Sequence, residues 1–275
     1  MAPPPGGSSL SGGLSGGLSG DLFDAAFGAD TARWPLPAAT DDEQLWLRAV
    51  AAGGQGRYAS AHADLDALLR ARPGGPLASL AHSTRGSFWR QLGWHVRART
   101  HDGRALALAG ADPQARSDAL VGLAADALGV GRFAASARLL ERAADLDTAV
   151  ARLPIRHAWV SAELAMATGA GDTAIGHAQR ARTLAAATDS TRHRIKSDVV
   201  AAAALCSAGQ IDVARTLADA ALAAARQGGL VPLCWALASL LTGIGSATLP
   251  DRDLDDLRTT AAEQVIRGGG EWSNR

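Results

Sequence analysis

Five glycines recur along this chain at an almost constant interval, and this regularity limits the folds that the chain can adopt. They are Gly56, Gly93, Gly131, Gly169 and Gly209, and subtraction of successive sequence numbers gives intervals of 37, 38, 38 and 40. A small residue follows each glycine by five positions: Ala61, Ala98, Ser136, Ala174 and Ala214. A fixed period of this length is typical of a repeat array.

The repeated unit is predicted to be a pair of antiparallel helices. Apolar residues between the glycines have helical spacing, and no strand pattern is found from about residue 41 to 267. The glycine permits the left-handed turn that ends the first helix, and the small residue lets the second helix cross closely. Leucine and alanine further along the second helix, such as Leu65 and Leu68, fill the seam between the two helices. We therefore expect an all-α solenoid of about five helix hairpins, followed by a capping helix pair at 231–245 and 251–266.

Three of these units resemble the tetratricopeptide repeat family. The residues that carry the resemblance are Gly53-Gly54-Gln55-Gly56-Arg57-Tyr58-Ala59-Ser60-Ala61 with Leu65, Leu68 and Pro73; Gly131-Arg132-Phe133 with Leu140 and Ala143; and Gly209-Gln210-Ile211-Asp212-Val213-Ala214. The resemblance covers roughly residues 41–230. The units are longer than the usual repeat of the family, which has about 34 residues, and they are more similar to the longer repeats in the sensor arms of some bacterial regulators. The resemblance implies a right-handed α-solenoid whose first helices line a concave groove for a protein segment.

The two ends of the chain differ in composition from the repeats. Residues 1–40 are rich in glycine, serine and proline, so we expect a disordered tail, followed by a repeat domain at 41–267 and a disordered end at 268–275. Within the tail, Leu22, Phe23, Ala26 and Phe27 form one short apolar cluster. This cluster either attaches loosely to the solenoid or is a linear motif that folds onto a partner.

Charge and composition exclude several classes of function. The formal net charge is zero, so no global field attracts nucleic acid or an acidic membrane, and no basic nucleic-acid stripe is found. No apolar run of about 18 residues is found, so no membrane span is expected. Cys206 and Cys234 lie in apolar, helical stretches, which favours a reducing compartment over a disulfide framework. We expect a cytoplasmic protein that binds neither nucleic acid nor membrane.

The chain carries no recognisable catalytic motif. No zinc-protease helix, phosphate loop, dinucleotide fingerprint or nucleophile elbow is found. The seven histidines are scattered over different repeats, whereas a metal site needs convergent ligands. We therefore expect a non-catalytic protein without a cofactor or a metal.

The second unit places polar residues at positions that are apolar in the other units. His82 and Arg85 occupy such positions on its first helix, and Asp102 lies on the seam of its second helix. One interpretation is an ion pair between Arg85 and Asp102 inside the hairpin. The other is a polar pocket in which Arg85, Arg90, His82 and Gln91 hold an anionic group.

Cations are concentrated at the starts of the fourth and fifth units: Arg152, Arg156 and His157, then Arg192, His193, Arg194 and Lys196. Cations at a helix N-terminus oppose the macrodipole, so they indicate either a functional surface or an ordinary solvated rim. If they are functional, the first helices of adjacent units should bring Arg156, Arg192, Arg194 and Lys196 into one shared surface.

The leading functional hypothesis is a non-catalytic scaffold or adaptor that binds another protein or peptide, acidic or mixed acidic and apolar, in the concave groove. Tryptophans on first helices would supply apolar anchors, because aromatic residues and arginine dominate binding hot spots. The candidate contact residues are Arg156, His157, Arg192, Arg194, Lys196, Arg90, Gln91, Trp46, Trp89 and Trp159. One alternative is a regulatory module of a transcription or signalling system. A second is an enzyme or small-anion receptor centred on the second repeat.

Overall fold

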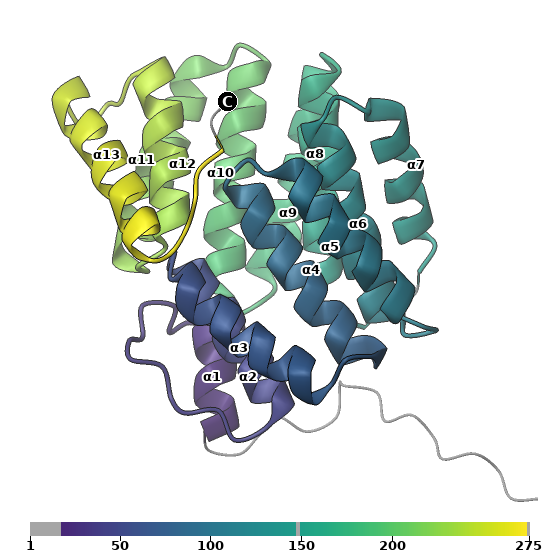
Figure 1. Cartoon of the computed structure of the whole chain (residues 1–275). Helices are drawn as coiled ribbons and strands as arrows, with labels where there is room; N and C mark the ends of the chain where they lie inside the picture. The colour runs from purple at the N-terminus through teal and green to yellow at the C-terminus, as the bar shows by residue number, and fades with distance from the viewer. Residues whose placement is uncertain (1–17, 147–148, 274–275) are drawn as a thin grey trace, which may run out of the picture.

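The computed structural model of this chain describes residues 18–146 and 149–273, and it is helical throughout (Figure 1). Within those ranges it contains thirteen α-helices and no strand. Their bounds are α1 Leu18–Phe27, α2 Asp42–Gly54, α3 Tyr58–Ala71, α4 Gly75–Gln91, α5 His95–Leu108, α6 Pro113–Gly129, α7 Phe133–Ala144, α8 Arg152–Ala167, α9 Gly171–Ala186, α10 Thr191–Ser207, α11 Ile211–Gln227, α12 Val231–Ile244 and α13 Asp251–Arg267. The predicted all-α fold class is confirmed.

Helices α2 to α11 form five consecutive hairpins, and α12 and α13 form the expected capping pair. Each of the five periodic glycines lies in the turn of its hairpin with φ between +75° and +87°, the left-handed region that favours glycine. The five small residues that follow these glycines are fully buried, at 0% exposure. The repeat register read from the sequence is therefore confirmed at both of its defining positions.

The first helix of each unit lies on the inner side of the solenoid. Helices α4, α6, α8, α10 and α12 each pack against the first helix of a neighbouring unit as well as against their own partner (Figure 1). This arrangement collects α2, α4, α6, α8, α10 and α12 around one central space.

The solenoid curves until its first and last units meet. Thr31 Oγ1 donates a hydrogen bond to Gly228 O at 2.9 Å, and the amide of Ala59 donates to Gly268 O at 2.7 Å. Val231 and Val265 pack against the hydrophobic core that α1 to α4 build. Contacts between the first and last units therefore curve the concave face around a central cavity that is partly open to solvent.

The predicted disorder of residues 1–40 is wrong for residues 18–40. Leu22 and Ala26 on α1 are 0% exposed and share a hydrophobic core with α2. The Phe27 ring lies 5.5 Å from Trp46 and 6.1 Å from the His193 ring on α10. The apolar cluster of α1 thus buries enough surface to offset its ordering entropy. The part of the prediction that concerns residues 1–17 lies outside the described residues.

The predicted disorder of residues 268–275 is wrong as far as residue 273. The Trp272 ring packs on Trp235 of α12, with centroids 4.3 Å apart. Trp94 Nε1 donates to Glu271 O at 2.7 Å, and the amide of Ser273 donates to Leu92 O at 2.8 Å. This segment fastens the last helix to the second unit. Residues 274–275 lie outside the described residues.

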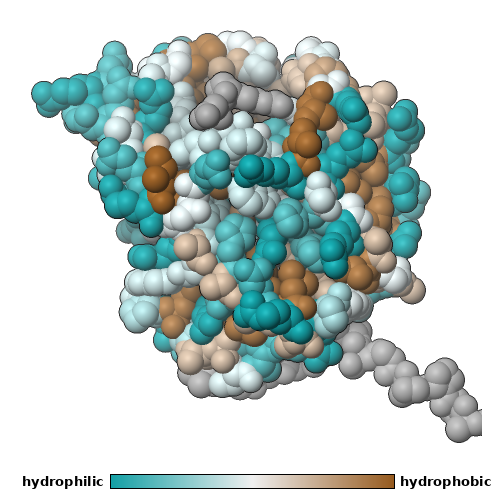
Figure 2. All heavy atoms as spheres, in the orientation of Figure 1, coloured by the Kyte–Doolittle hydropathy of each residue, from teal (hydrophilic) through white to brown (hydrophobic). Residues whose placement is uncertain are grey.

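On the face seen in Figure 2, apolar residues form small separate patches among polar ones. The exposed large apolar side chains lie on different elements along the chain: Phe23, Trp34, Val96, Phe133, Val213 and Ile266. None of the helices in the described ranges is both long and apolar enough to cross a bilayer.

Candidate functional site

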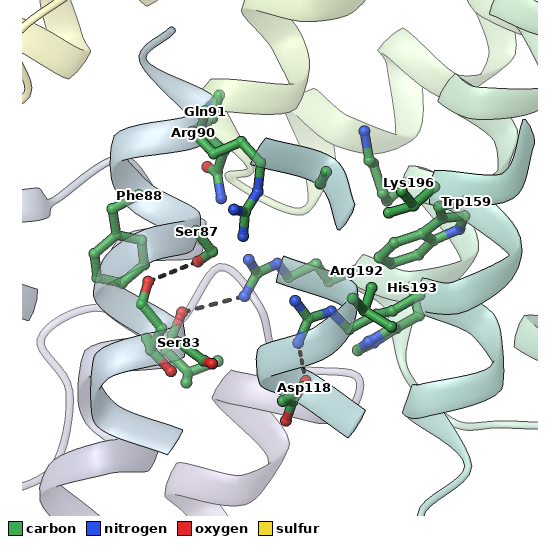
Figure 3. A pocket seen from close by; sticks show the side chains of 18 of the residues that line it. Ser83, Ser87, Phe88, Arg90, Gln91, Asp118, Trp159, Arg192, His193 and Lys196 are labelled. Carbon is green, nitrogen blue, oxygen red and sulfur yellow. Dashed lines mark hydrogen bonds and ion pairs between the residues drawn. The ribbon is translucent and has the colours of Figure 1, made fainter. Parts of the chain in front are cut away.

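A cavity of about 420 Å³ lies between the six first helices. Its walls combine large aromatic rings with cationic side chains. The aromatic residues are Phe27, Trp46, Phe88, Trp159 and Trp235, and the charged ones are Arg90, Asp118, Arg152, Arg156, Glu163, Arg192 and Lys196. These residues come from units far apart in the sequence, and Figure 3 shows part of the arrangement. The closure of the solenoid is what gathers them.

Asp118 on α6 is the acceptor for two arginines of the next unit. Arg152 donates to its two carboxylate oxygens at 2.9 and 2.5 Å, and Arg156 also donates to it. Burial alone would raise the pKa of Asp118, but the two arginines more than offset this effect and lower it. Asp118 therefore stays ionised. Two guanidinium groups share one carboxylate, which leaves one positive charge in excess.

Arg192 extends from the start of α10 to α2. Its Nη1 donates to Val50 O at 3.3 Å, and none of the carboxylates in the described part of the chain forms an ion pair with it. Burial lowers the pKa of Arg192 to about 10, and repulsion from Arg156 and Arg152 adds to the fall. The guanidinium is still charged at neutral pH, so Arg192 contributes a second uncompensated positive charge.

Arg90 on α4 is paired with two buried carboxyl groups. Its Nη1 donates to Asp102 Oδ2 at 2.9 Å, to Asp126 and to Gly122 O at 3.1 Å. Both aspartates are 0% exposed and contact each other. Burial raises the pKa of Asp126 to about 8 against the pull of Arg90, and the negative charge of Asp102 adds to the rise. Burial also raises the pKa of Asp102, so the pair holds at least one proton at neutral pH, and both carboxyl groups contact Arg90.

Two glycines make the room that Asp102 occupies. Gly86 and Gly122 lie in the interiors of α4 and α6, where glycine costs about 1 kcal/mol relative to alanine. A Cβ atom at Gly86 would lie only 2.6 Å from Asp102 Oδ2, and one at Gly122 would overlap the same carboxylate. These mid-helix glycines were a usable signal in the sequence for a group buried between adjacent units.

The predicted ion pair between Arg85 and Asp102 is wrong. Arg85 Nη2 bonds Asp66 Oδ1 at 2.5 Å on α3, and Asp102 is held by Arg90. Arg85 and Arg90 are five residues apart on α4, which separates their directions by about 140°. One arginine therefore faces α3 while the other faces α5 and α6.

The predicted pocket of Arg85, Arg90, His82 and Gln91 does not form as a unit. Arg90 and Gln91 line the central cavity. His82 instead stacks on His101 at 5.9 Å, on another face of α4. Burial lowers the pKa of each of these two histidines to about 4, so both are neutral at physiological pH.

The structure brings together three of the four cations of the predicted shared surface. Those that line the cavity are Arg156, Arg192 and Lys196. Arg194 turns back on its own helix start, where it donates to Thr188 O at 2.8 Å and Thr191 Oγ1 at 3.0 Å. Two residues along a helix rotate the side chain by about 200°, so Arg192 and Arg194 face nearly opposite ways.

Two other predicted contact residues also lie outside the cavity. His157 Nε2 is bonded to Leu140 O of α7 at 3.0 Å, and Trp89 lies 5.1 Å from the guanidinium of Arg97. Trp46 and Trp159 do line the cavity. Trp46, Ser83 and Trp159 share one position relative to the turn glycine of their unit, and Trp89 does not. Position relative to the turn glycine therefore decides which residues face inward.

One wall of the cavity is a neutral aromatic stack. The His193 ring stacks on Trp159 at 5.4 Å, and its Nδ1 lies 2.7 Å from Ser190 Oγ. Burial, with the nearby arginines, holds the pKa of His193 well below its ordinary value. Trp159 Nε1 donates to Ser197 Oγ at 2.9 Å, so its indole is fixed in the wall. His193 thus adds a flat surface to the site and no charge.

Ser83 and Asp118 are cavity residues that the sequence analysis did not single out. Ser83 is 4% exposed, lines the cavity, and its Oγ finds no hydrogen-bond partner in the described part of the chain. Asp118, Arg156 and Lys196 also share one position relative to the turn glycine of their unit. Alignment of the units on their turn glycines would have placed these three side chains at equivalent positions of adjacent first helices.

The arrangement suits the binding of an anion beside a flat apolar group. No group of three or more histidine, cysteine or acidic residues in the described ranges is placed to hold a metal ion. No protein-family model matches this chain, and comparison with curated proteins finds no significant match.

Proposed function

We propose that the chain is a tetratricopeptide-like repeat protein that binds a small organic anion in its central cavity. The observation that carries the proposal is Arg192, a partly buried guanidinium with no carboxylate partner in the described part of the chain. Charges buried in proteins are nearly always paired, because desolvation is costly. Arg152 and Arg156 together carry one more positive charge than Asp118 neutralises, so the cavity lacks a further negative charge. An anionic ligand would supply the missing negative charge.

The cavity has the dimensions and walls of a small-molecule site. Its volume of about 420 Å³ falls in the usual range for ligand pockets, which runs from about 300 to 1,000 Å³. Trp159 and Trp235 line the same cavity and are partly exposed, so they offer apolar surface to a ligand. A ligand with an anionic group and an apolar or aromatic body would contact both.

The binding of an extended protein segment along the concave face has less support. Phe27 of α1 already occupies part of that face, and residues 268–273 fasten its other end. We therefore favour the small-anion alternative over the scaffold role.

Arg192 and Arg194 provide a matched test of this proposal. The substitutions Arg192→Gln and Arg194→Gln make the same change in charge on the same helix, but only Arg192 lines the cavity. Isothermal titration of the unmodified protein with phenyl phosphate and with benzoate should detect binding of at least one. Arg192→Gln should reduce it by about tenfold or more, and Arg194→Gln should leave it unchanged. Equal losses in the two variants, or no binding of either probe, would overturn the proposal.

A further inference from the structure

We infer that the ligand is a phosphate monoester, whose dianionic phosphoryl group lies between Arg192, Arg90 and Ser83. This inference rests on the proposed function and specifies its ligand class. It is carried by the charge balance of the cavity and by the positions of its unused donors.

The cavity is short of two negative charges. Arg152 and Arg156 together exceed Asp118 by one, and Arg192 adds a second. Arg90 is paired with Asp102 and Asp126. A further pair, Lys196 Nζ and Glu163 Oε1, lies 3.5 Å apart and is balanced. A carboxylate would neutralise only one of the two excess charges, whereas a phosphate monoester carries up to two near neutral pH.

The donors surround a space instead of lying in one plane. Figure 3 shows Arg90 and Arg192 pointing into the same region from α4 and α10, with Ser83 and Ser87 on the α4 side. The Ser83 hydroxyl is buried and lacks a partner in the described part of the chain. The one hydrogen bond that the structure gives Arg192 leaves most of its five N–H donors free. Three phosphoryl oxygens can accept from donors on several sides, and guanidinium groups bind phosphate well.

The ester body would lie against the aromatic walls. Trp159 and the His193 ring stacked on it form a flat surface beside Arg192. Free inorganic phosphate would leave this surface uncovered. A cavity of about 420 Å³ that Phe27 of α1 also lines accommodates a small phosphorylated molecule better than an extended phosphorylated peptide.

The test compares probes of similar size that differ in charge. Phenyl phosphate, benzenesulfonate, benzoate and inorganic phosphate would be titrated into the full chain by calorimetry. The titrations would be made about one pH unit above and about one below the second phosphate pKa of about 6. Benzenesulfonate is a monoanion at both pH values, so it reports any effect of the titration of the protein itself.

At the higher pH, phenyl phosphate should bind about tenfold or more tightly than benzenesulfonate and benzoate, and more tightly than inorganic phosphate. The advantage over benzenesulfonate should shrink at the lower pH. Arg192→Gln should remove most of that advantage, and Arg194→Gln should preserve it. Ser83→Ala should weaken the binding of phenyl phosphate several-fold and should leave the binding of benzoate unchanged.

The possible failures are distinguishable. Equal binding of all three aromatic anions, still dependent on Arg192, would overturn the phosphate inference and leave the proposed function standing. If inorganic phosphate binds as tightly as phenyl phosphate, the inference that the ligand is a monoester is overturned. Binding of phenyl phosphate that ignores Arg192→Gln, or no binding of any probe at millimolar concentration, would overturn both proposals.

Discussion

Arg192 is held in the folded chain at a cost in stability, because its charge is partly removed from solvent without a carboxylate partner. A charge that is taken out of water without a partner carries a desolvation penalty, which an apolar side chain of similar volume avoids. Arg192→Met should therefore raise the free energy of unfolding of the ligand-free protein by ~1–3 kcal/mol in urea denaturation. Arg194→Met, at a residue bonded to its own helix start, should not do so. A less stable Arg192→Met protein would show that the bond to Val50 O outweighs the buried charge.

Asp126 should make stability depend on pH in a defined direction. The pKa of this carboxyl is about 8 in the folded chain against an ordinary 3.8, so the folded state holds the extra proton between these values. Its stabilising effect is complete below about pH 4 and is lost as the pH rises through about 8. Asp126→Asn cannot lose this proton, so the variant should gain stability relative to the unmodified protein over that range.

The readout for Asp126→Asn is the difference in free energy of unfolding between the two proteins at each pH. His82 and His101 have lowered pKa values of about 4, so they contribute stability that is lost as the pH falls. Both proteins contain them, and their effect cancels in the difference. A difference that stays constant from about pH 4 to about pH 8 would contradict the shared-proton account of Asp102 and Asp126.

Sequence reasoning identified many residues of the site but not their directions. It selected Arg156, Arg192 and Lys196, which line the cavity, together with Arg194, which does not. Each residue along a helix turns a side chain by about 100°, so composition at a helix start cannot decide which cation faces inward. The partner of Asp102 was missed for the same reason. Position relative to the turn glycine carries that information.

At the scale of elements, the helix hairpins were predictable and the chain ends were not. A turn glycine such as Gly131 and a crossing residue such as Ser136 are constrained by contacts within one unit, so their period is visible in the sequence. Helix α1 is instead stabilised by contacts with α2 and with α10. Helix α2 follows a proline-containing stretch, and α10 is distant in sequence. The apolar cluster of the tail was visible in the sequence, but the sequence did not show that it packs against the repeats.

The buried face of α1 can be tested with two neighbouring residues. Leu22 is 0% exposed and Phe23 is 41% exposed on the same helix. Leu22→Ala should lower the free energy of unfolding by ~2–5 kcal/mol in chemical denaturation, because it opens a cavity in the core shared with α2. Phe23→Ala should cost less than half as much. Negligible losses for both would mean that α1 contributes little to the fold in solution.

At the scale of the whole molecule, closure should couple units that an open array would leave independent. In a linear solenoid each unit contacts only its neighbours, so a change in the last unit affects the first ones little. Here Trp272 packs on Trp235 beside the segment that Trp94 and Leu92 hold. Trp272→Ala should therefore reduce amide hydrogen-exchange protection in α4 as well as in α12 and α13.

Arg267→Ala, at an exposed residue of α13, is the control for Trp272→Ala. It should leave the protection of α4 unchanged. If Trp272→Ala lowers protection only in α12 and α13, the contact between the two ends is too weak to couple them.

Closure also bears on how this gene can evolve. An open solenoid can lengthen or shorten by duplication or loss of a unit, because each new unit needs only its neighbours. In this chain an additional unit of about 38 residues, the spacing of the turn glycines, would shift Gly228 away from Thr31 and Gly268 away from Ala59. The cavity would open and its charged residues would separate. Descendants of this sequence that keep the cavity should therefore keep its number of units and vary in the outer helices.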